Sequence, residues 1–317
     1  MYSRIVGTGA YLPEKVLTNF DLEKMLDTTD EWIRTRTGIE RRHIAAEDQA
    51  TSDLSEHACR SALEAAGLTP ADIDLVVVGT CTPDLVFPNV ACLLQERMGM
   101  SGAAFSVEAA CSGFVYALSV ADKFVRAGQA KRALVSGAEV MSRIIDWTDR
   151  ETCVLFGDGA GAVVLEASEE AGILYTDLGA DGRYRHLLYA DSGVSRVKEE
   201  GETTLMMKGN EVFKVAVRTL EGMVDRVLSE NGLEQGEIDW FVPHQANLRI
   251  IRATARRLGL PMERVVLTVR DHGNTSAASI PMALDTAVRD GRIKPGDLVL
   301  MEAFGGGFTW GASLVRY

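Results

Sequence analysis

The sequence predicts an α/β protein built from two related halves, and three observations support this prediction. Short apolar runs typical of buried strands alternate with helical patterns along the 317 residues, as they do in α/β folds. The order of these elements in the first half is repeated in the second. No linker rich in proline, serine or glycine separates the halves, so we expect residues 1–171 and 172–317 to share an interface.

The elements of the first half follow from the spacing of its apolar residues. The run Leu75-Val76-Val77-Val78 has the length and the β-branched content of a buried strand. Residues spaced as on an amphipathic helix precede this run and return after Cys111. We expect strands at residues 1–7, 75–78, 105–107 and 133–136, and helices at residues 54–66 and 114–127.

The second half repeats this plan closely enough to indicate an internal duplication. Residues 73–77 are echoed by residues 238–242, and each segment follows a helix that ends in Gly-Leu. We match the other strands in the same way, pairing residues 105–107 with 266–269 and residues 132–135 with 297–300. Self-similarity along the whole chain is the signature of a repeated structural unit.

Composition excludes several classes of function. A net charge of −12 argues against general binding of nucleic acid, which needs a basic surface. The five cysteines lie far apart and form no Cys-x-x-Cys pair, so we expect neither a disulfide framework nor a zinc site. We find no signal peptide and no apolar run of about 18 residues. The prediction is a cytoplasmic protein with no metal, nucleic-acid or membrane partner.

Cys111 is a candidate nucleophile because of the turn in which it lies. Between residues 107 and 114 a strand ends, small residues permit a tight turn, and a long amphipathic helix begins. The partial positive charge at a helix N-terminus favours the thiolate, which is the nucleophilic form of cysteine. A buried structural cysteine is the competing interpretation.

His244 and Asn274 occupy comparable places in the second half. His244 follows an apolar strand, where α/β folds carry functional loops, and Asn274 lies in a polar turn that opens a helix. A single histidine at this place does not by itself indicate a functional site, and Asn274 taken alone is typical of a helix cap or a turn. The duplication, however, places Cys111 and Asn274 at equivalent turns, so we expect the three side chains to converge.

Two glycine-rich segments have different interpretations. Residues 304–308 follow an expected strand and can bring backbone N–H groups to a reacting carbonyl, as an oxyanion hole does, although a tight hairpin explains them equally well. Residues 157–161 match Gly-x-Gly-x-Gly, but a strand rather than a helix follows, so a dinucleotide site is not expected. His43, His57 and His186 show no metal-binding spacing.

A papain-like hydrolase also combines cysteine, histidine and asparagine, and its asparagine orients the histidine that activates the cysteine. The Cys-Gly-Ser-Cys-Trp type of signature near the N-terminus is missing, and Cys111 lies inside a repeated α/β half. Seven blocks in order instead resemble the β-ketoacyl-acyl-carrier-protein synthase III family of thiolase-fold condensing enzymes. The blocks are residues 7–13, 30–39, 109–114, 156–162, 243–247, 272–279 and 304–311.

The resemblance implies a five-layered αβαβα thiolase fold, a homodimer and an enzyme that initiates fatty-acid synthesis. It implies that Cys111 takes an acyl group from a short acyl-CoA such as acetyl-CoA, and that His244 and Asn274 assist decarboxylation of malonyl-acyl-carrier protein. The N–H groups of Cys111 and Gly306 would hold the oxyanion. Phe304 would lie near the malonyl group. Coenzyme A enters as part of a substrate, and no cofactor or metal is implied.

The resemblance also assigns residues at the entrance of the site. Phe87 would close the acyl pocket across the dimer interface. The implied coenzyme A residues are Trp32, Arg36, Arg150, Gly209, Phe213, Ala246, Asn247 and Arg249. The basic residues expected to dock the acidic carrier protein are Arg249, Arg252, Arg256, Arg257 and Lys214. A solvated helix face or ordinary ion pairs would explain the same arginines.

Three other functions stay open beside this one. A plant-type polyketide synthase or a hydroxymethylglutaryl-CoA synthase is related, but both are usually longer. A synthase-III-like acyltransferase of secondary metabolism would pass the acyl group to oxygen or nitrogen. An inactive thiolase-fold binding subunit would need none of Cys111, His244 and Asn274, and their joint presence favours an enzyme.

Overall fold

The computed structural model describes residues 1–191, 193–195 and 204–317, and its first sheet belongs to the N-terminal half. The sheet order is β1 (Tyr2–Tyr11), β7 (Gly159–Ser168), β6 (Arg132–Glu139), β4 (Leu75–Gly79) and β5 (Ala103–Val107). Strand β4 is parallel to β5 and β6, whereas β7 runs antiparallel to both β6 and β1. Each strand expected in this half is present.

The second sheet repeats the first with one strand fewer. Its order is β11 (Trp240–Pro243), β12 (Leu298–Gly305), β13 (Thr309–Arg316) and β8 (Ile173–Ala180). In the first sheet two parallel pairs are followed by two antiparallel pairs, and in the second one parallel pair is followed by two antiparallel pairs. The equivalence of β4 with β11 and of β6 with β12 confirms the predicted duplication. The boundary after residue 171 falls between β7 and β8 and stays a prediction.

The expected strand at residues 266–269 is wrong. In its place a single parallel bridge joins Phe241 to Val265, residues 266–268 form neither strand nor helix, and α8 (Val269–His272) follows. The cause is the buried amide of Gln245, whose Oε1 accepts the backbone N–H groups of Thr268 and Val269 at 2.9 and 3.0 Å. These two N–H groups are satisfied by a side chain, so the ladder does not continue.

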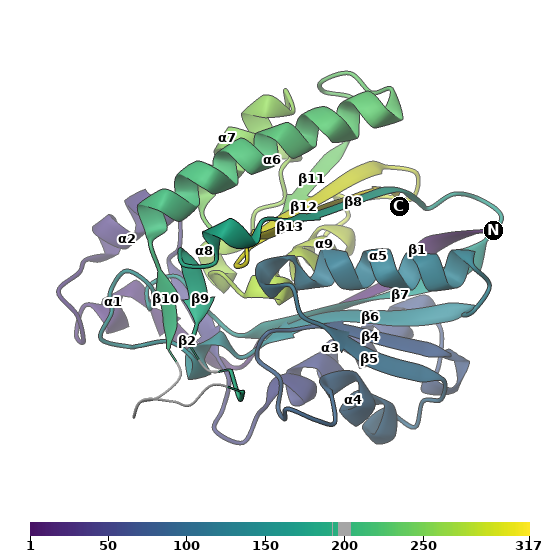
Figure 1. Cartoon of the computed structure of the whole chain (residues 1–317), viewed down its shortest axis with the longest axis horizontal. Coiled ribbons are helices and arrows are strands. Elements are labelled where there is room, and N and C mark those ends of the chain that lie inside the picture. Colours follow the sequence, from purple (N-terminus) through teal and green to yellow (C-terminus); the bar gives the residue numbers. More distant parts are fainter. Residues whose placement is uncertain (192, 196–203) are drawn as a thin grey trace.

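Helices form three further layers around the two sheets (Figure 1). Helices α5 (Gly113–Arg126) and α9 (Ser279–Arg289) pack between the sheets. The outer face of the first sheet is covered by α3 (Thr51–Ala66) and α4 (Val90–Met98), and that of the second by α6 (Gly209–Asn231) and α7 (Leu248–Arg257). The five-layered αβαβα architecture is therefore confirmed.

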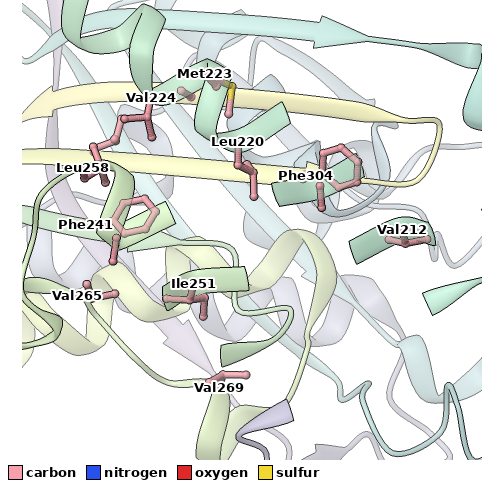
Figure 2. Packing of buried hydrophobic residues seen from close by; sticks show 14 of the residues in the cluster. Val212, Leu220, Met223, Val224, Phe241, Ile251, Leu258, Val265, Val269 and Phe304 are labelled. Atoms are coloured by element: carbon pink, nitrogen blue, oxygen red, sulfur yellow. The ribbon is translucent and has the colours of Figure 1, made fainter. Parts of the chain in front are cut away.

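Strands buried on both faces divide their side chains between two cores. In β4, Leu75 and Val77 pack with the central helices, while Val76 and Val78 pack under α3 and α4, as the alternation of a strand requires. Figure 2 shows the third core, where Leu220 of α6 and Ile251 lie near Phe241. Burying each such side chain contributes roughly 1.5–3 kcal/mol.

Shorter elements complete the chain and frame one end of the molecule. They are β2 (Lys15–Thr18), α1 (Asn19–Leu22), α2 (Asp30–Thr37), β3 (Arg41–Ile44), β9 (Leu188–Ala190) and β10 (Leu205–Met207). Helix α2 is capped by Thr29, whose side chain accepts the Trp32 N–H at 3.1 Å, and it ends at Gly38 with φ of 81°. Within the described residues, no helix combines the length and apolarity needed to span a bilayer.

Candidate active site

Cys111 lies in a strained turn at the start of the central helix α5. The 3₁₀ turn Ala110–Ser112 leads directly into α5, and Ala110 has φ of 45°, which is unusual for a residue other than glycine. Thr309 fixes the turn from β13, since its Oγ1 donates to Ala109 O at 2.8 Å. Cys111 is buried with 9% of its surface exposed.

The second half builds the same turn before α9. There the 3₁₀ turn Ser276–Ala278 precedes the helix, and Ser276 has φ of 49°. The two turns meet, because a Cβ on Gly113 would lie 3.3 Å from Ala277 Cβ. The predicted equivalence of the turns thus holds, but Cys111 corresponds to Ala277 rather than to Asn274, which lies three residues earlier.

A cavity of about 470 Å³ brings the predicted catalytic residues together. Its walls include Cys111, His244, Asn274 and Phe304. The backbone places two of them firmly: His244 N donates to Glu302 O at 2.8 Å, and Asn274 N donates to Leu155 O at 2.9 Å. Residues from both halves of the chain therefore line one site.

His244 is a neutral imidazole that forms a hydrogen bond with Ser279. Burial lowers the pKa of His244 to about 4. Its Nδ1 lies 2.6 Å from Ser279 Oγ, and this same oxygen accepts the Gln245 backbone N–H at 3.3 Å. When the Ser279 hydroxyl donates its hydrogen to Nδ1, the ring carries its proton on Nε2. A neutral donor of this kind can stabilise an oxyanion.

Asn274 is oriented by the turn that follows it. Its Oδ1 accepts the Ser276 backbone N–H at 2.9 Å, which turns the Nδ2 group the opposite way. Phe156 forms a parallel bridge with Asn274 and thereby ties it to the first half. The arrangement leaves the amide donors of Asn274 for a ligand in the cavity it lines.

The resting thiol differs from the sequence expectation. Burial is the main cause that raises the pKa of Cys111 to about 11; the hydrogen bond with Ser276 acts in the opposite direction, and the nearby Glu139 carboxylate acts in the same direction as burial. With this pKa, Cys111 is a protonated thiol at pH 7, whereas the sequence led us to expect a thiolate. A base must then take its proton before or during attack.

The cavity opens beside an aromatic and arginine cluster. The guanidinium carbons of Arg36 and Arg150 lie 4.4 and 5.1 Å from the centroid of Trp32. All three side chains line the cavity, together with Glu151. Planar cations stacked on an indole suit a nucleotide, because they offer a flat surface and positive charge.

The other predicted entrance residues also line the cavity, namely Gly209, Phe213, Ala246, Asn247 and Arg249. Arg249 lies over the Phe213 ring at 5.0 Å. Two predicted residues lie elsewhere: neither Gly306 nor Phe87 is among the described residues of the cavity wall. Gly306 is beside the nucleophile turn, since a Cβ there would lie 3.6 Å from Ala110 Cβ, whereas Phe87 is 82% exposed.

Helix α7, which is predicted to dock the carrier protein, has fewer unpaired positive side chains than its sequence indicates. Arg249, Arg252 and Arg256 are exposed, as is Lys214 on the neighbouring α6. Arg257 instead forms a two-pronged ion pair with Asp225, with Nε to Oδ1 at 2.7 Å. The positive charge of Arg257 is therefore largely balanced within the protein.

Sequence reasoning missed four polar residues around the reacting atoms. Ser276, Ser279 and Glu139 make the buried contacts behind Cys111 and His244, and Glu302 lines the cavity. Burial raises the pKa of Glu302 well above its ordinary value, and among the described residues its Oε1 has no hydrogen-bond partner. One signal was available, because Glu302 interrupts an otherwise apolar strand. The described residues contain no cluster of metal ligands.

Comparison with known proteins identifies the family. The model described as 3-oxoacyl-[acyl-carrier-protein] synthase III matches residues 105–182, and that for its C-terminal part matches residues 228–317. The chain is 65% identical to β-ketoacyl-[acyl-carrier-protein] synthase III of Thioalkalivibrio sulfidiphilus and 64% identical to that of Xanthomonas campestris, covering 100% of this chain and 99% of each relative. The solved 3-oxoacyl-[acyl-carrier-protein] synthase III of Aquifex aeolicus is similar at a TM-score of 0.94 and 50% identity, over 99% of this chain and 100% of that one. The chain therefore belongs to the β-ketoacyl-[acyl-carrier-protein] synthase III family and has its thiolase fold.

Proposed function

We propose that this condensing enzyme joins a short acyl-CoA, such as acetyl-CoA, to malonyl-acyl-carrier protein with loss of carbon dioxide. The products are a 3-oxoacyl-acyl-carrier protein and free coenzyme A, and the reaction starts fatty-acid synthesis. The observation that carries the proposal is the single cavity that Cys111, His244 and Asn274 line. Membership of the synthase III family supports the same reaction class.

In the first half-reaction, Cys111 attacks the thioester carbon of the acyl-CoA. A covalent acyl-cysteine forms and coenzyme A leaves. The backbone N–H groups of Cys111 and Gly306 hold the oxyanion, a role supported by the closeness of Gly306 to the nucleophile turn. Trp32, Arg36 and Arg150 hold the nucleotide end at the cavity entrance.

In the second half-reaction, the malonyl thioester replaces coenzyme A in the cavity. Its carboxylate leaves as carbon dioxide, and the electron pair moves into an enolate. His244 Nε2–H and the Asn274 amide donate hydrogen bonds to the enolate oxygen, a role that their hydrogen-bonded orientations support. The enolate carbon then attacks the acyl-Cys111 carbonyl. Phe304 packs beside this reacting group.

The proposal extends to the assembly that performs the reaction. The enzyme works in the cytoplasm as a homodimer, and the exposed Phe87 reaches the acyl pocket of the partner subunit. The carrier protein docks on the exposed arginines of α7 and on Lys214. Coenzyme A and carrier-protein thioesters are substrates, and no metal takes part.

The test is a two-step incubation followed by mass spectrometry. Acetyl-CoA should add one acetyl group to the Cys111 peptide, and later addition of malonyl-acyl-carrier protein should yield 3-oxobutyryl-carrier protein. Cys111→Ala should lose both products. Labelling of Cys59, Cys81, Cys92 or Cys153 with full activity of Cys111→Ala would reject the proposal.

The same experiment separates the secondary-metabolite acyltransferase. That enzyme would still acylate Cys111, but it would transfer the acyl group to an oxygen or nitrogen of an acceptor and release no carbon dioxide. A panel of acyl-CoA primers of increasing length, tested with malonyl-acyl-carrier protein, would also define the primer that the sequence leaves open.

A further inference from the structure

A buried carboxyl group lies behind the nucleophile. Glu139 ends β6 and Ser276 begins the turn before α9, and at most 1% of either residue is exposed. The Ser276 Oγ lies 3.5 Å from Cys111 Sγ and 3.1 Å from Glu139 Oε1. Neither residue is among the described residues that line the cavity. The contact therefore reaches Cys111 from the side away from the substrate.

The chemistry of these groups gives the contacts a direction. A hydroxyl has one hydrogen and donates to one acceptor at a time, while an ionised carboxylate only accepts. In the structure Ser276 Oγ is placed to donate to both Cys111 Sγ and Glu139 Oε1, but its single hydrogen can serve only one of them at a time. When Ser276 donates to Glu139, its oxygen is free to accept the hydrogen of the Cys111 thiol. The three groups form a continuous path for a proton from sulfur to carboxylate.

The surroundings of Glu139 act on its pKa in opposite directions. Thr82 and Thr80 donate from Oγ1 to Glu139 Oε2 at 2.5 and 3.1 Å, and the Cys81 backbone N–H donates to both oxygens at 3.2 Å. These bonds favour the carboxylate, whereas burial raises the pKa of Glu139 above its ordinary value. A carboxylate with a raised pKa is a stronger base.

Among the described residues, only Ser276 makes a hydrogen bond to Cys111 Sγ, so the other titratable groups nearby have no hydrogen-bonded path to the sulfur. His244 has a pKa lowered to about 4 and directs its free Nδ1 lone pair at Ser279. The Cys81 thiol has a pKa well above its ordinary value because it is buried. Glu108 is exposed, and its Oε1 already accepts a hydrogen bond from the Ala110 N–H at 2.9 Å. Glu108 is therefore not connected to Cys111.

The duplicated turn shows that the serine is not required by the backbone. Ala110 occupies the equivalent position in the first half with nearly the same positive φ, 45° against 49°. The turn therefore accepts alanine, and the hydroxyl at position 276 has a separate use. The hydroxyl contacts the Cys111 sulfur and the Glu139 carboxylate and so connects the two.

We propose that Ser276 and Glu139 form a proton relay that removes the Cys111 proton during acylation, an inference that rests on the proposed function. As Cys111 Sγ bonds to the thioester carbon, its S–H bond breaks and the proton moves to Ser276 Oγ. The hydroxyl hydrogen of Ser276 passes to Glu139 Oε1. Coenzyme A leaves as a thiolate and is protonated by water. When condensation releases the Cys111 thiolate, the proton returns by the same path and regenerates the thiol.

The test measures single-turnover acetylation of Cys111 by acetyl-CoA between pH 6 and 10. Ser276→Gly removes the hydroxyl and relieves the positive φ, and Glu139→Gln removes the base. Ala110→Gly is the matched control, since it relieves the equivalent φ without deleting a relay group. Because general base catalysis contributes about 10²–10⁴-fold, both relay variants should acetylate at least about 10²-fold more slowly at pH 7. Their rates should then rise about tenfold per pH unit as thiolate forms directly.

Other measurements distinguish the relay from a purely structural role. Coenzyme A affinity and the thermal midpoint report an intact fold, and alkylation of Cys111 by iodoacetamide reports thiolate formation without any acyl substrate. Acetylation by Ser276→Gly with the wild-type rate and pH profile would overturn the relay. Loss of coenzyme A binding in both variants would also overturn it, in favour of a structural role. Failure of the wild-type enzyme to acetylate Cys111 would instead reject the proposed function.

Discussion

At the scale of single residues, burial shifts the titratable groups around the reacting atoms toward their uncharged forms. Burial raises the pKa of Cys111 and Glu302 and lowers that of His244. A neutral imidazole donates from only one ring nitrogen, and donation from Ser279 to Nδ1 would leave that donor at Nε2. Reactivity in this cavity therefore depends on the direction of hydrogen bonds more than on fixed charges.

Replacing His244 or Asn274 should separate the two half-reactions. Each donates to the proposed enolate, and losing one oxyanion-type donor typically lowers the rate by roughly 10²–10³-fold. We expect His244→Ala and Asn274→Ala to lose decarboxylation and condensation on this scale while Cys111 still becomes acetylated. The measurements are release of labelled carbon dioxide and mass of the Cys111 peptide. Lost acetylation with normal decarboxylation would contradict these roles.

Ser279→Ala should lower decarboxylation less than His244→Ala does. Without the hydroxyl, Nδ1 and Nε2 compete for the imidazole proton, and a neutral hydrogen bond is worth about 0.5–1.5 kcal/mol. We expect a fall of about tenfold at most, with partial recovery in Ser279→Thr. Nitrogen NMR of the labelled histidine ring reports the tautomer directly. An unchanged tautomer together with the wild-type rate would contradict this role for Ser279.

Glu302→Gln should stabilise the protein increasingly as pH rises. The pKa of Glu302 is raised in the folded state, so above its ordinary value of about 4.5 the unfolded chain releases a proton that the folded chain retains. Folding stability then falls with rising pH, and glutamine removes this loss. Thermal midpoints of both proteins from pH 4 to pH 8 check the prediction. A constant difference over that range would contradict it.

At the scale of elements, Arg252 and Arg256 of α7 should matter more for docking than Arg257. Arg252 and Arg256 are exposed, whereas Arg257 is paired with Asp225. Among the described residues, neither Arg252 nor Arg256 makes an ion pair within 4.0 Å of a carboxylate. A charge already balanced within the protein adds little to the attraction of an acidic partner.

Single neutralising changes test this difference with an internal control. We expect Arg252→Gln and Arg256→Gln to weaken binding of malonyl-acyl-carrier protein and to reduce the dependence of affinity on salt. Arg257→Gln, which removes the same formal charge, should have the smaller effect. Titration calorimetry at several salt concentrations provides the comparison. Equal losses in all three variants would show that the Asp225 pair does not reduce the contribution of Arg257.

The sequence predicted those elements whose pattern of apolar residues follows directly from burial in the core. The apolar runs that became β4, β11, β6 and β12 were found because both faces of these strands are covered. The turns carrying Cys111 and Asn274 were found because the repeat aligns them. The strand expected at residues 266–269 is absent because the Gln245 side-chain amide accepts backbone N–H groups that a sheet would use. The apolar pattern of the sequence does not reveal this interaction.

Parts of the site could not be predicted because they depend on contacts distant in the sequence. The pairing of Ser276 with Glu139 joins residues 137 positions apart. The pairing of Arg257 with Asp225 likewise balances a positive charge that appears free in the sequence. Burial of Cys111, which opposes the effect of the helix N-terminus on its pKa, follows only from three-dimensional packing.

At the scale of the whole molecule, the duplicated fold brings two equivalent turns together between two sheets. This arrangement leaves one conspicuous apolar segment outside: Leu85, Val86 and Phe87 are 50%, 67% and 82% exposed. Three consecutive exposed apolar residues are typical of an interaction surface. The proposed dimer would bury this segment and bring Phe87 to the acyl pocket of the partner subunit.

Two changes at this segment should therefore affect assembly and specificity separately. Val86→Asp places a charge in the proposed interface and should shift the protein from dimer to monomer in light scattering, whereas Phe20→Asp, at an aromatic residue 62% exposed on α1, should leave the mass unchanged. Phe87→Ala should preserve the dimer but enlarge the acyl pocket, so longer acyl-CoA primers should be used better relative to acetyl-CoA. If Phe87→Ala had the wild-type primer preference in a dimer of wild-type mass, Phe87 would not reach the pocket, and the primer would be selected within one chain.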